Sequence, residues 1–230
     1  MFTDRFKSLR YLLLSLPIVV LVAFSISRNA VSSSIAESSP AKSTTSLSIV
    51  AENGKKVVVL AGGCFWGVEG VFEHVKGVSE VVSGYSGGDA KTANYPRVSS
   101  GETGHAEAVK ITYDPTQISY AQLLKIYFSV AHDPTQINRQ GPDEGPQYRS
   151  AIFFANDEQR QIAAGYIAQL NQARTFPKSI ATQLVSLDTF YAAESEHQNF
   201  LAHNPKHPYI VYHDLPKLEQ LRKQFPALYQ

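Results

Sequence analysis

A short strand, a glycine turn and a helix follow one another at the start of the globular region, and this succession limits the fold more than any other feature. Residues 57–60 form a continuous apolar run that predicts a buried strand, which Gly62-Gly63 ends. From Phe65 onward apolar residues recur at helical spacing, which predicts a helix closed by Gly77. Both elements must bury an apolar face, so we expect helices and a sheet to pack in layers.

The rest of the chain continues this mixture of strands and helices. Strands are expected at residues 78–86, 106–113, 150–155 and 183–187. Helices are expected after the N-cap residues Ser119 and Asn156, and near residues 192–201 and 215–224. The strand at 106–113 alternates in polarity, so we expect it to be half-buried. These elements predict an α+β fold, a two-layer α/β sandwich of the ferredoxin-like kind, with helices covering a central mixed sheet.

The N-terminal residues differ in composition from the rest. Residues 1–30 combine a basic start, an apolar stretch and small residues, the pattern of a signal peptide or an N-terminal membrane anchor. The apolar stretch is short for a membrane span, which needs about 20 residues. Residues 31–54 are rich in Ser, Thr and Ala and predict a flexible linker, leaving residues 55–230 as the globular domain with a C-terminal tail. We expect an exported protein, periplasmic or otherwise extracytoplasmic, either released or anchored.

Composition argues against several kinds of partner and site. The chain has 21 Lys and Arg against 20 Asp and Glu, a net charge of +1 that gives no basic excess pointing to nucleic acid. One cysteine excludes an intramolecular disulfide and a cysteine-rich zinc site. His203, His207 and His213 cluster in the sequence, but Pro205 and Pro208 break helical continuity between them. We therefore expect no metal and no cofactor.

The single cysteine, Cys64, stands where the predicted helix begins. Free backbone amides and the positive end of the helix dipole are expected to lower the pKa of its thiol and to favour the thiolate. Phe65 and Trp66 would place an aromatic wall beside it. A lone cysteine is more often a small buried apolar residue. Here Gly63 and Gly67 flank Cys-Phe-Trp, which favours a nucleophile because a core position gains nothing from them.

The segment Gly63-Cys64-Phe65-Trp66-Gly67 resembles the signature of the peptide methionine sulfoxide reductases of type A. Further segments resemble blocks of that family in the same order: residues 84–88 (Gly-Tyr-Ser-Gly-Gly), Tyr95 with residues 101–109 (Gly-Glu-Thr-Gly-His-Ala-Glu-Ala-Val), residues 138–143 with 147–150, and residues 190–194 with His197-Gln198. The similarity extends from about residue 56 to about residue 212. It implies that residues 55–230 form a catalytic methionine sulfoxide reductase domain.

The resemblance also implies a role for individual residues. Cys64 would attack the sulfoxide sulfur of an oxidised methionine, and Glu107 would donate a proton to the sulfoxide oxygen, which requires a neutral carboxyl group. Tyr95 and Tyr148 would bind that oxygen through their hydroxyl groups. Asp143 matches a further polar residue of the pocket. Taken alone, Glu107 could face solvent from an alternating strand, and the two tyrosines would carry no signal among 12.

The resemblance also implies how the substrate binds: Phe65 and Trp66 would hold its methyl group. The implied substrate is the S epimer of methionine sulfoxide, free or in proteins, and the implied role is repair of oxidised proteins. The chain would thus be a peptide-methionine (S)-S-oxide reductase. We expect a monomer, because no extra apolar face is evident.

The cysteine count separates this chain from many members of the family. Those members resolve the sulfenic acid with a second cysteine, but here Val98-Ser99-Ser100 and residues 204–230 contain none. The sulfenic acid on Cys64 would therefore need an external thiol, from a thioredoxin-like or glutaredoxin-like protein or from a small thiol. The sequence does not identify this reductant.

Two other functions fit parts of the pattern. A cysteine hydrolase would pair Cys64 with a histidine base, for which His105, His132 and His197 are the candidates. Cleavage of a peptide or ester that depends on Cys64 would support it. A non-catalytic protein that binds oxidised methionine is the other alternative, and binding without turnover in dithiothreitol would favour it.

Overall fold

Six strands form the main sheet in the computed structural model, which describes residues 54–230. They are β1 (Lys56–Gly62), β2 (Val78–Ser86), β3 (Ala106–Tyr113), β6 (Ser150–Phe154), β7 (Gln183–Ser186) and β8 (Phe190–Ala192), in the order β7-β6-β1-β3-β2-β8. The β6/β7 pair is parallel and the other neighbouring pairs are antiparallel. β4 (Arg139–Gln140) and β5 (Asp143–Glu144) form a separate ribbon. The predicted signal or anchor and all of the predicted linker but Gly54 lie outside the described residues.

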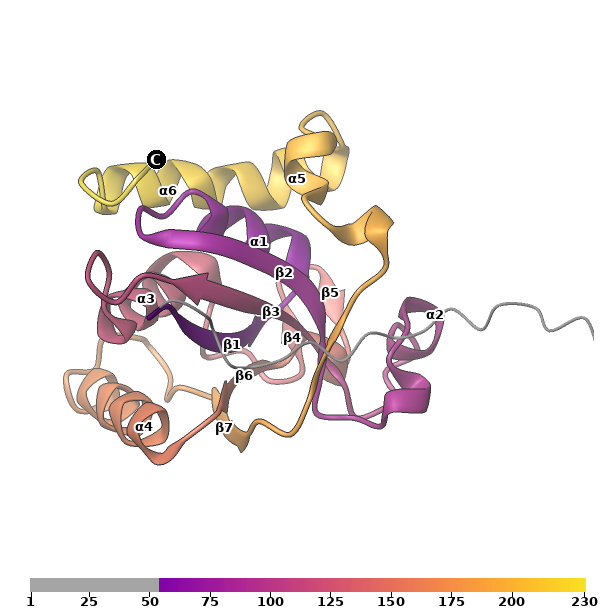
Figure 1. Ribbon diagram of the computed structural model, residues 1–230, viewed down its shortest axis with the longest axis horizontal. Helices are drawn as coiled ribbons and strands as arrows, with labels where there is room; N and C mark the ends of the chain where they lie inside the picture. Colours follow the sequence, from indigo (N-terminus) through magenta and orange to yellow (C-terminus); the bar gives the residue numbers. More distant parts are fainter. Residues whose placement is uncertain (1–53) are drawn as a thin grey trace, which may run out of the picture. The chain divides into compact units, whose positions relative to one another are not determined.

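Helices of very different lengths connect these strands (Figure 1). The α-helices are α1 (Phe65–Glu73), α2 (Tyr95–Val98), α3 (Tyr120–Ile126), α4 (Asp157–Gln172), α5 (Phe200–His203) and α6 (Leu215–Gln224). The 3-10 turns are η1 (Ala90–Thr92), η3 (Pro146–Tyr148) and η4 (Ser195–His197), and the π-helical turns are η2 (Tyr127–Ala131) and η5 (Ile210–Asp214). Within residues 54–230 no helix has the length and apolarity needed to cross a membrane.

The central four strands confirm the predicted fold class. The chain runs β1-α1-β2-β3-α3-β6, and these strands stand in the order β6-β1-β3-β2. β3 lies antiparallel to both β1 and β2, so β1 and β2 run parallel with β3 between them. This split arrangement is the ferredoxin-like one, and it brings the start of α1 next to the end of β1. β7 and β8 extend the sheet at its two edges.

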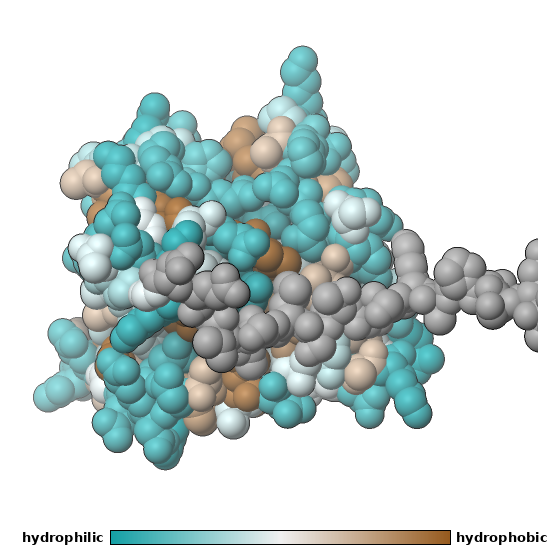
Figure 2. Space-filling model, viewed as in Figure 1, coloured by the Kyte–Doolittle hydropathy of each residue, from teal (hydrophilic) through white to brown (hydrophobic). Residues whose placement is uncertain are grey.

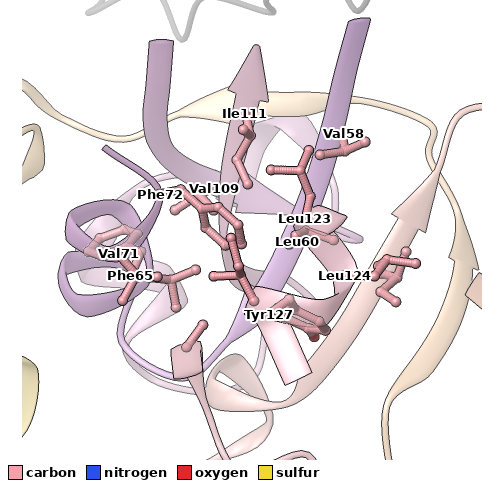
Figure 3. Packing of buried hydrophobic residues seen from close by; sticks show 14 of the residues in the cluster. Val58, Leu60, Phe65, Val71, Phe72, Val109, Ile111, Leu123, Leu124 and Tyr127 are labelled. Carbon is pink, nitrogen blue, oxygen red and sulfur yellow. The ribbon is translucent and has the colours of Figure 1, made fainter. Parts of the chain in front are cut away.

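The sheet buries side chains on both faces. Alternate residues of β1 face opposite ways: Val58 and Leu60 join the main core, whereas Val59 and Ala61 join a smaller cluster. In the main core, side chains of α1 and α3 meet those of β1 and β3 (Figure 3). Polar residues cover most of the surface seen in Figure 2, with apolar residues in small groups between them. The apolar faces of the helices therefore provide the packing that supports the sheet.

Three details differ from the sequence-based expectations. β3 is buried on both faces rather than one, because Ala106 and Ala108 pack in the smaller cluster with Phe153 and Phe190. Helix α1 ends at Glu73, and the chain then turns through Gly77, whose φ is +88°. The helix expected near 192–201 is wrong at its start: β8 pairs there with the end of β2, and only the short turns η4 and α5 follow.

Two glycine substitutions should change stability in opposite directions. In Gly84→Ala the new Cβ would collide with the carbonyl oxygen of Tyr191, so we expect a loss of about 1–3 kcal/mol from overpacking between β2 and β8. In Gly165→Ala, inside α4, nothing lies within 4 Å of the new Cβ, so we expect a gain of up to about 1 kcal/mol from helix propensity. Urea unfolding of both variants measures this, and equal midpoints would contradict it.

Candidate active site

Cys64 occupies the N-cap position of α1, directly after the turn that ends β1. The turn needs a glycine at position 63, because φ there is +90° and a Cβ would press against the side chain of Gln140. Cys64 is partly exposed, whereas the residues that precede and follow it in β1 and α1 are largely buried. Cys64 is thus held in place by two rigid elements.

The carboxyl group of Glu107 closes the start of the same helix. Glu107 lies in β3 with 2% of its surface exposed, and its Oε2 accepts a hydrogen bond from the backbone N–H of Phe65 at 3.0 Å. Burial raises the pKa of Glu107 to about 8, although the Phe65 N–H acts in the opposite direction. Glu107 is therefore mostly neutral at pH 7, and it does not face solvent.

The thiol of Cys64 has a pKa well above its ordinary value, opposite to the direction expected from the helix start. Burial is the main cause, and the carboxylates of Glu107 and Asp214 add to it. A backbone hydrogen bond from Trp66 favours the thiolate but is outweighed. The sequence-based prediction of a lowered pKa is wrong because the dipole of a short helix competes with two buried acids and loss of water. Cys64 therefore rests as a thiol.

Tyr95 and Tyr148 come to this site from two short helical turns that are far apart in the sequence. Tyr95 begins α2, and its backbone N–H donates to the carboxylate of Glu194 at 3.0 Å. Tyr148 ends η3. Burial raises the pKa of both phenols, and the charges of Glu107 and Cys64 raise it further. Both hydroxyl groups therefore keep their protons and can act as hydrogen-bond donors near Cys64.

Asp143 is bound to a residue that the sequence reasoning missed. The hydroxyl of Tyr209 donates a hydrogen bond to the carboxylate of Asp143 in β5. The ring of Tyr209 also stands edge-on to Trp66, with centroids 5.9 Å apart. Burial raises the pKa of Tyr209, and the charge of Cys64 adds to it. No local pattern marks this tyrosine, because only the fold brings residue 209 to the start of α1.

A second missed residue explains the last glycine of the pentapeptide. Asp214 is fully buried, and its Oδ1 lies 3.0 Å from Nζ of Lys217. The same oxygen occupies the space where a Cβ of Gly67 would be, so only glycine fits in this turn of α1. Its other oxygen, Oδ2, is buried without a hydrogen-bond partner in the described part of the chain. Burial raises the pKa of Asp214, although Lys217 lowers it.

The two aromatic residues after Cys64 differ in exposure. Phe65 is almost completely buried, and its ring packs against Tyr85 and His197 with centroids 5.9 and 5.3 Å apart. Trp66 is half-buried and stacks on Phe200 with centroids 3.6 Å apart. Its indole N–H donates to Nδ1 of His197 at 3.3 Å. Trp66 therefore forms the reachable part of the aromatic wall, and Phe65 supports it from the core.

The three histidines considered as bases for Cys64 are held in other roles. His105 uses both ring nitrogens, toward the N–H of Gly88 at 3.2 Å and the carbonyl of Asp89 at 3.0 Å. His132 lies with Nε2 2.7 Å from the hydroxyl of Ser150, and burial lowers its pKa to about 4. His197 lies at the site, but there it accepts the hydrogen bond from Trp66. Residues 54–230 contain no group of acidic, histidine or cysteine side chains arranged to hold a metal ion.

Comparison with known proteins gives this arrangement a family. The family model "Peptide methionine sulfoxide reductase" matches residues 56–228. The chain belongs to this family. A relative from Mesorhizobium japonicum, "Peptide methionine sulfoxide reductase MsrA 2", is 59% identical over 176 residues, which cover 76% of this chain and 90% of the relative. "Peptide methionine sulfoxide reductase MsrA" of Thermus thermophilus is 46% identical over 174 residues, covering 76% and 97%.

Solved structures agree with that assignment. Reduced Mxr1 from Saccharomyces cerevisiae has a TM-score of 0.64 and 31% identity, covering 70% of this chain and 94% of its own. Methionine sulfoxide reductase A of Corynebacterium diphtheriae has a TM-score of 0.59 and 36% identity, covering 68% and 78%. The protein is therefore an enzyme that reduces methionine sulfoxide and so repairs oxidised proteins. The α+β fold predicted from the sequence is the fold of these reductases.

Substitution of Glu107 tests the electrostatics of the reductase site. Glu107→Gln removes a negative charge beside Cys64 but keeps an oxygen that can accept the Phe65 N–H. We therefore expect the pKa of Cys64 to fall, so that alkylation by iodoacetamide begins at lower pH than in the unchanged enzyme. Rates measured between pH 6 and 11 give the midpoint. Glu219→Gln, at an exposed position of α6, is the control, and an unmoved midpoint in Glu107→Gln would contradict the assignment.

Proposed function

We propose that Cys64 reduces the S epimer of methionine sulfoxide, in proteins and as the free amino acid, with Glu107 as the proton donor. The observation that supports this most strongly is the buried, largely neutral carboxyl of Glu107 bonded to the N–H that follows Cys64. A neutral carboxyl can protonate the sulfoxide oxygen, and the resulting carboxylate can take the proton of the Cys64 thiol. The hydroxyl groups of Tyr95 and Tyr148 would bind the same oxygen.

The chemistry balances without any other reagent in its first half. The sulfur of Cys64 bonds to the sulfoxide sulfur while the oxygen is protonated. The oxygen and its proton are then transferred to Cys64, the bond between the two sulfurs breaks, and the thioether of methionine leaves. The net change is one thiol plus one sulfoxide giving one sulfenic acid plus one thioether. Cys64 is oxidised by two electrons, and the substrate sulfur is reduced by two.

Each of the other residues near Cys64 has a role in this proposal. Trp66 offers an apolar face for the methyl group of the substrate, with Phe65 behind it. Asp143 accepts the hydrogen bond of Tyr209 and so fixes a third phenol beside Trp66. No step requires a metal or an organic cofactor. The alternatives of a non-catalytic binder and of a hydrolase lack such an assignment for Glu107.

The second half of the cycle needs a thiol from outside the chain, because Cys64 is the single cysteine of the sequence. One thiol attacks the sulfenic sulfur, releases water and leaves a mixed disulfide, and a second thiol then frees Cys64. Each of the proposed donors, a thioredoxin-like protein, a glutaredoxin-like protein or a small thiol, can provide both equivalents. The C-terminal segment cannot replace them, because residues 204–230 contain no cysteine.

We further propose that the enzyme is exported and works as a monomer. The basic, apolar and small-residue pattern of residues 1–30 supports a signal peptide or an anchor, followed by the linker at 31–54 and the catalytic domain at 55–230. A periplasmic or other extracytoplasmic site would place the enzyme beside the exported proteins that it repairs.

An assay of both sulfoxide epimers in dithiothreitol tests the proposed function. We expect turnover of the S epimer alone, no turnover in Cys64→Ser, and a loss of about 10²–10⁴ in kcat in Glu107→Gln. Because the neutral form of Glu107 is required and its pKa is about 8, kcat/KM should fall as pH rises through about 8. Activity that survived Cys64→Ser would overturn the proposal, and binding without turnover would favour the non-catalytic alternative.

Mass spectrometry after a single turnover without reductant tests how the cycle ends. We expect the chain to gain one oxygen at Cys64, because no second cysteine can convert the sulfenic acid into an intramolecular disulfide. Trapping by a dimedone reagent should give the same site. A product two hydrogens lighter than the starting protein would rule out this cycle.

A further inference from the structure

The outer edge of β2 is paired along only part of its length. β8 bonds to residues Gly84, Tyr85 and Ser86, whereas the preceding residues 78–82 have no strand beside them in the described part of the chain. β3 pairs with the other edge of β2 throughout. An open strand edge presents backbone N–H and C=O groups to which another extended chain can bond.

A side-chain amide marks the point where pairing stops. Oε1 of Gln198 accepts the backbone N–H of Ser83 at 3.0 Å, and its Nε2 donates to the carbonyl of Ser83 at 2.9 Å. The amide thus imitates one residue of a neighbouring strand. Backbone groups point to the same edge at every second residue of a strand, so Val81 directs its N–H and C=O to the side where Gln198 lies. No described residue bonds to them there.

A groove of about 680 Å³ runs beside this open edge. Residues 78–82 of β2 line it, together with Gln198 and Asn199 and with Glu73 and Gln230. The segment that carries β8 runs past one end of β2 and continues to α5, which agrees with this placement (Figure 1). At about 3.3 Å per residue, the five open residues 78–82 offer an edge as long as an extended segment of about five residues.

The charges around the groove are mostly negative. Glu73 and Glu80 line it; the fully buried Glu69 lies next to Ser83 and Asn199, but burial raises its pKa to about 7, so it is only partly charged at neutral pH. Both carboxyl oxygens of Glu69 are without a hydrogen-bond partner in residues 54–230. The opposing groups are Lys110, whose Nζ lies 4.0 Å from Glu80, and His74 and His203, which are both close to Glu73. A basic side chain is therefore the complementary occupant.

The groove and the reductase site share one short segment of chain. Asn199 lines the groove, and the next residue, Phe200, stacks on Trp66 with ring centroids 3.6 Å apart. The two preceding residues also contact one site each: His197 accepts a hydrogen bond from Trp66, and Gln198 bonds to Ser83 of β2 beside the groove. A polypeptide that leaves the groove over this segment arrives at the aromatic wall beside Cys64.

We propose that the open edge of β2 binds an extended segment of the oxidised protein substrate, which adds to the sheet beside Val81 and carries a Lys or Arg toward Glu73 and Glu80. This inference rests on the proposed function and specifies its substrate: an unfolded polypeptide gains contacts that free methionine sulfoxide lacks. Backbone hydrogen bonds would supply affinity and the acidic rim would supply preference.

Val81→Pro tests the open edge without removing a β2–β3 hydrogen bond, because the N–H that it deletes points outward. The probe is a twelve-residue peptide with one methionine sulfoxide and one lysine in an extended flank. We expect its KM to rise about fivefold in Val81→Pro, the effect of losing a hydrogen bond of ordinary strength, with little change in Val81→Ala. Both variants should reduce N-acetylmethionine sulfoxide with unchanged kcat/KM, which also shows that they are folded.

A second comparison changes the peptide instead of the enzyme. N-methylation of the flank removes its backbone donors, so the KM of the unchanged enzyme for this peptide should rise by a similar factor. Glu80→Gln should raise KM for the lysine peptide but not for a peptide with glutamine in place of lysine. Equal KM values for the methylated and unmethylated peptides would overturn the inference, as would a dimer that Val81→Pro dissociates. Failure of the unchanged enzyme on N-acetylmethionine sulfoxide would instead count against the proposed function.

Discussion

The hydrogen bond from the N–H of Phe65 to the carboxyl of Glu107 is the interaction on which the site depends. It joins the first turn of α1 to the middle of the sheet across 42 positions of sequence. Glu107 is buried in β3, and this burial raises its pKa to about 8 and keeps the group mostly neutral at pH 7, although the Phe65 N–H itself lowers that pKa. The bond therefore holds Cys64 beside the carboxyl group that we propose as its proton donor, and burial keeps the proton on that group.

The same buried surroundings raise the pKa of the Cys64 thiol. Loss of water and the nearby acids Glu107 and Asp214 hold Cys64 in its protonated form. A protonated thiol is less open to stray oxidation than a thiolate, which suits an enzyme whose single cysteine has no partner to rescue it. In the proposed mechanism the reaction requires the sulfoxide, because its oxygen accepts a proton from Glu107 and the resulting carboxylate can then accept another from Cys64. The substrate itself thus completes the activation.

Local signals along the chain predicted much of the fold because their causes are local. The capping box at Ser119 and Gln122 is formed as expected, with both of its hydrogen bonds present. The apolar run of β1 and the period change at Phe65 also gave elements where they were expected. The burial of β3 on both faces could not be predicted, since the side chains that cover Ala106 and Ala108 come from distant strands. β8 was not predicted, because a strand of three residues is too short to show the alternation of polar and apolar residues that marks a strand.

The sequence by itself determined the family, and it carries the proposals of Cys64 as nucleophile and of an external thiol, because a motif and a count of one cysteine require no coordinates. The tertiary structure decided what those residues do to each other. It reversed the expected pKa direction of Cys64, and it brought Tyr209 and Asp214 to the start of α1. It also left half of one edge of β2 open. All of these follow from burial and from contacts between residues far apart in the chain, which no local pattern encodes.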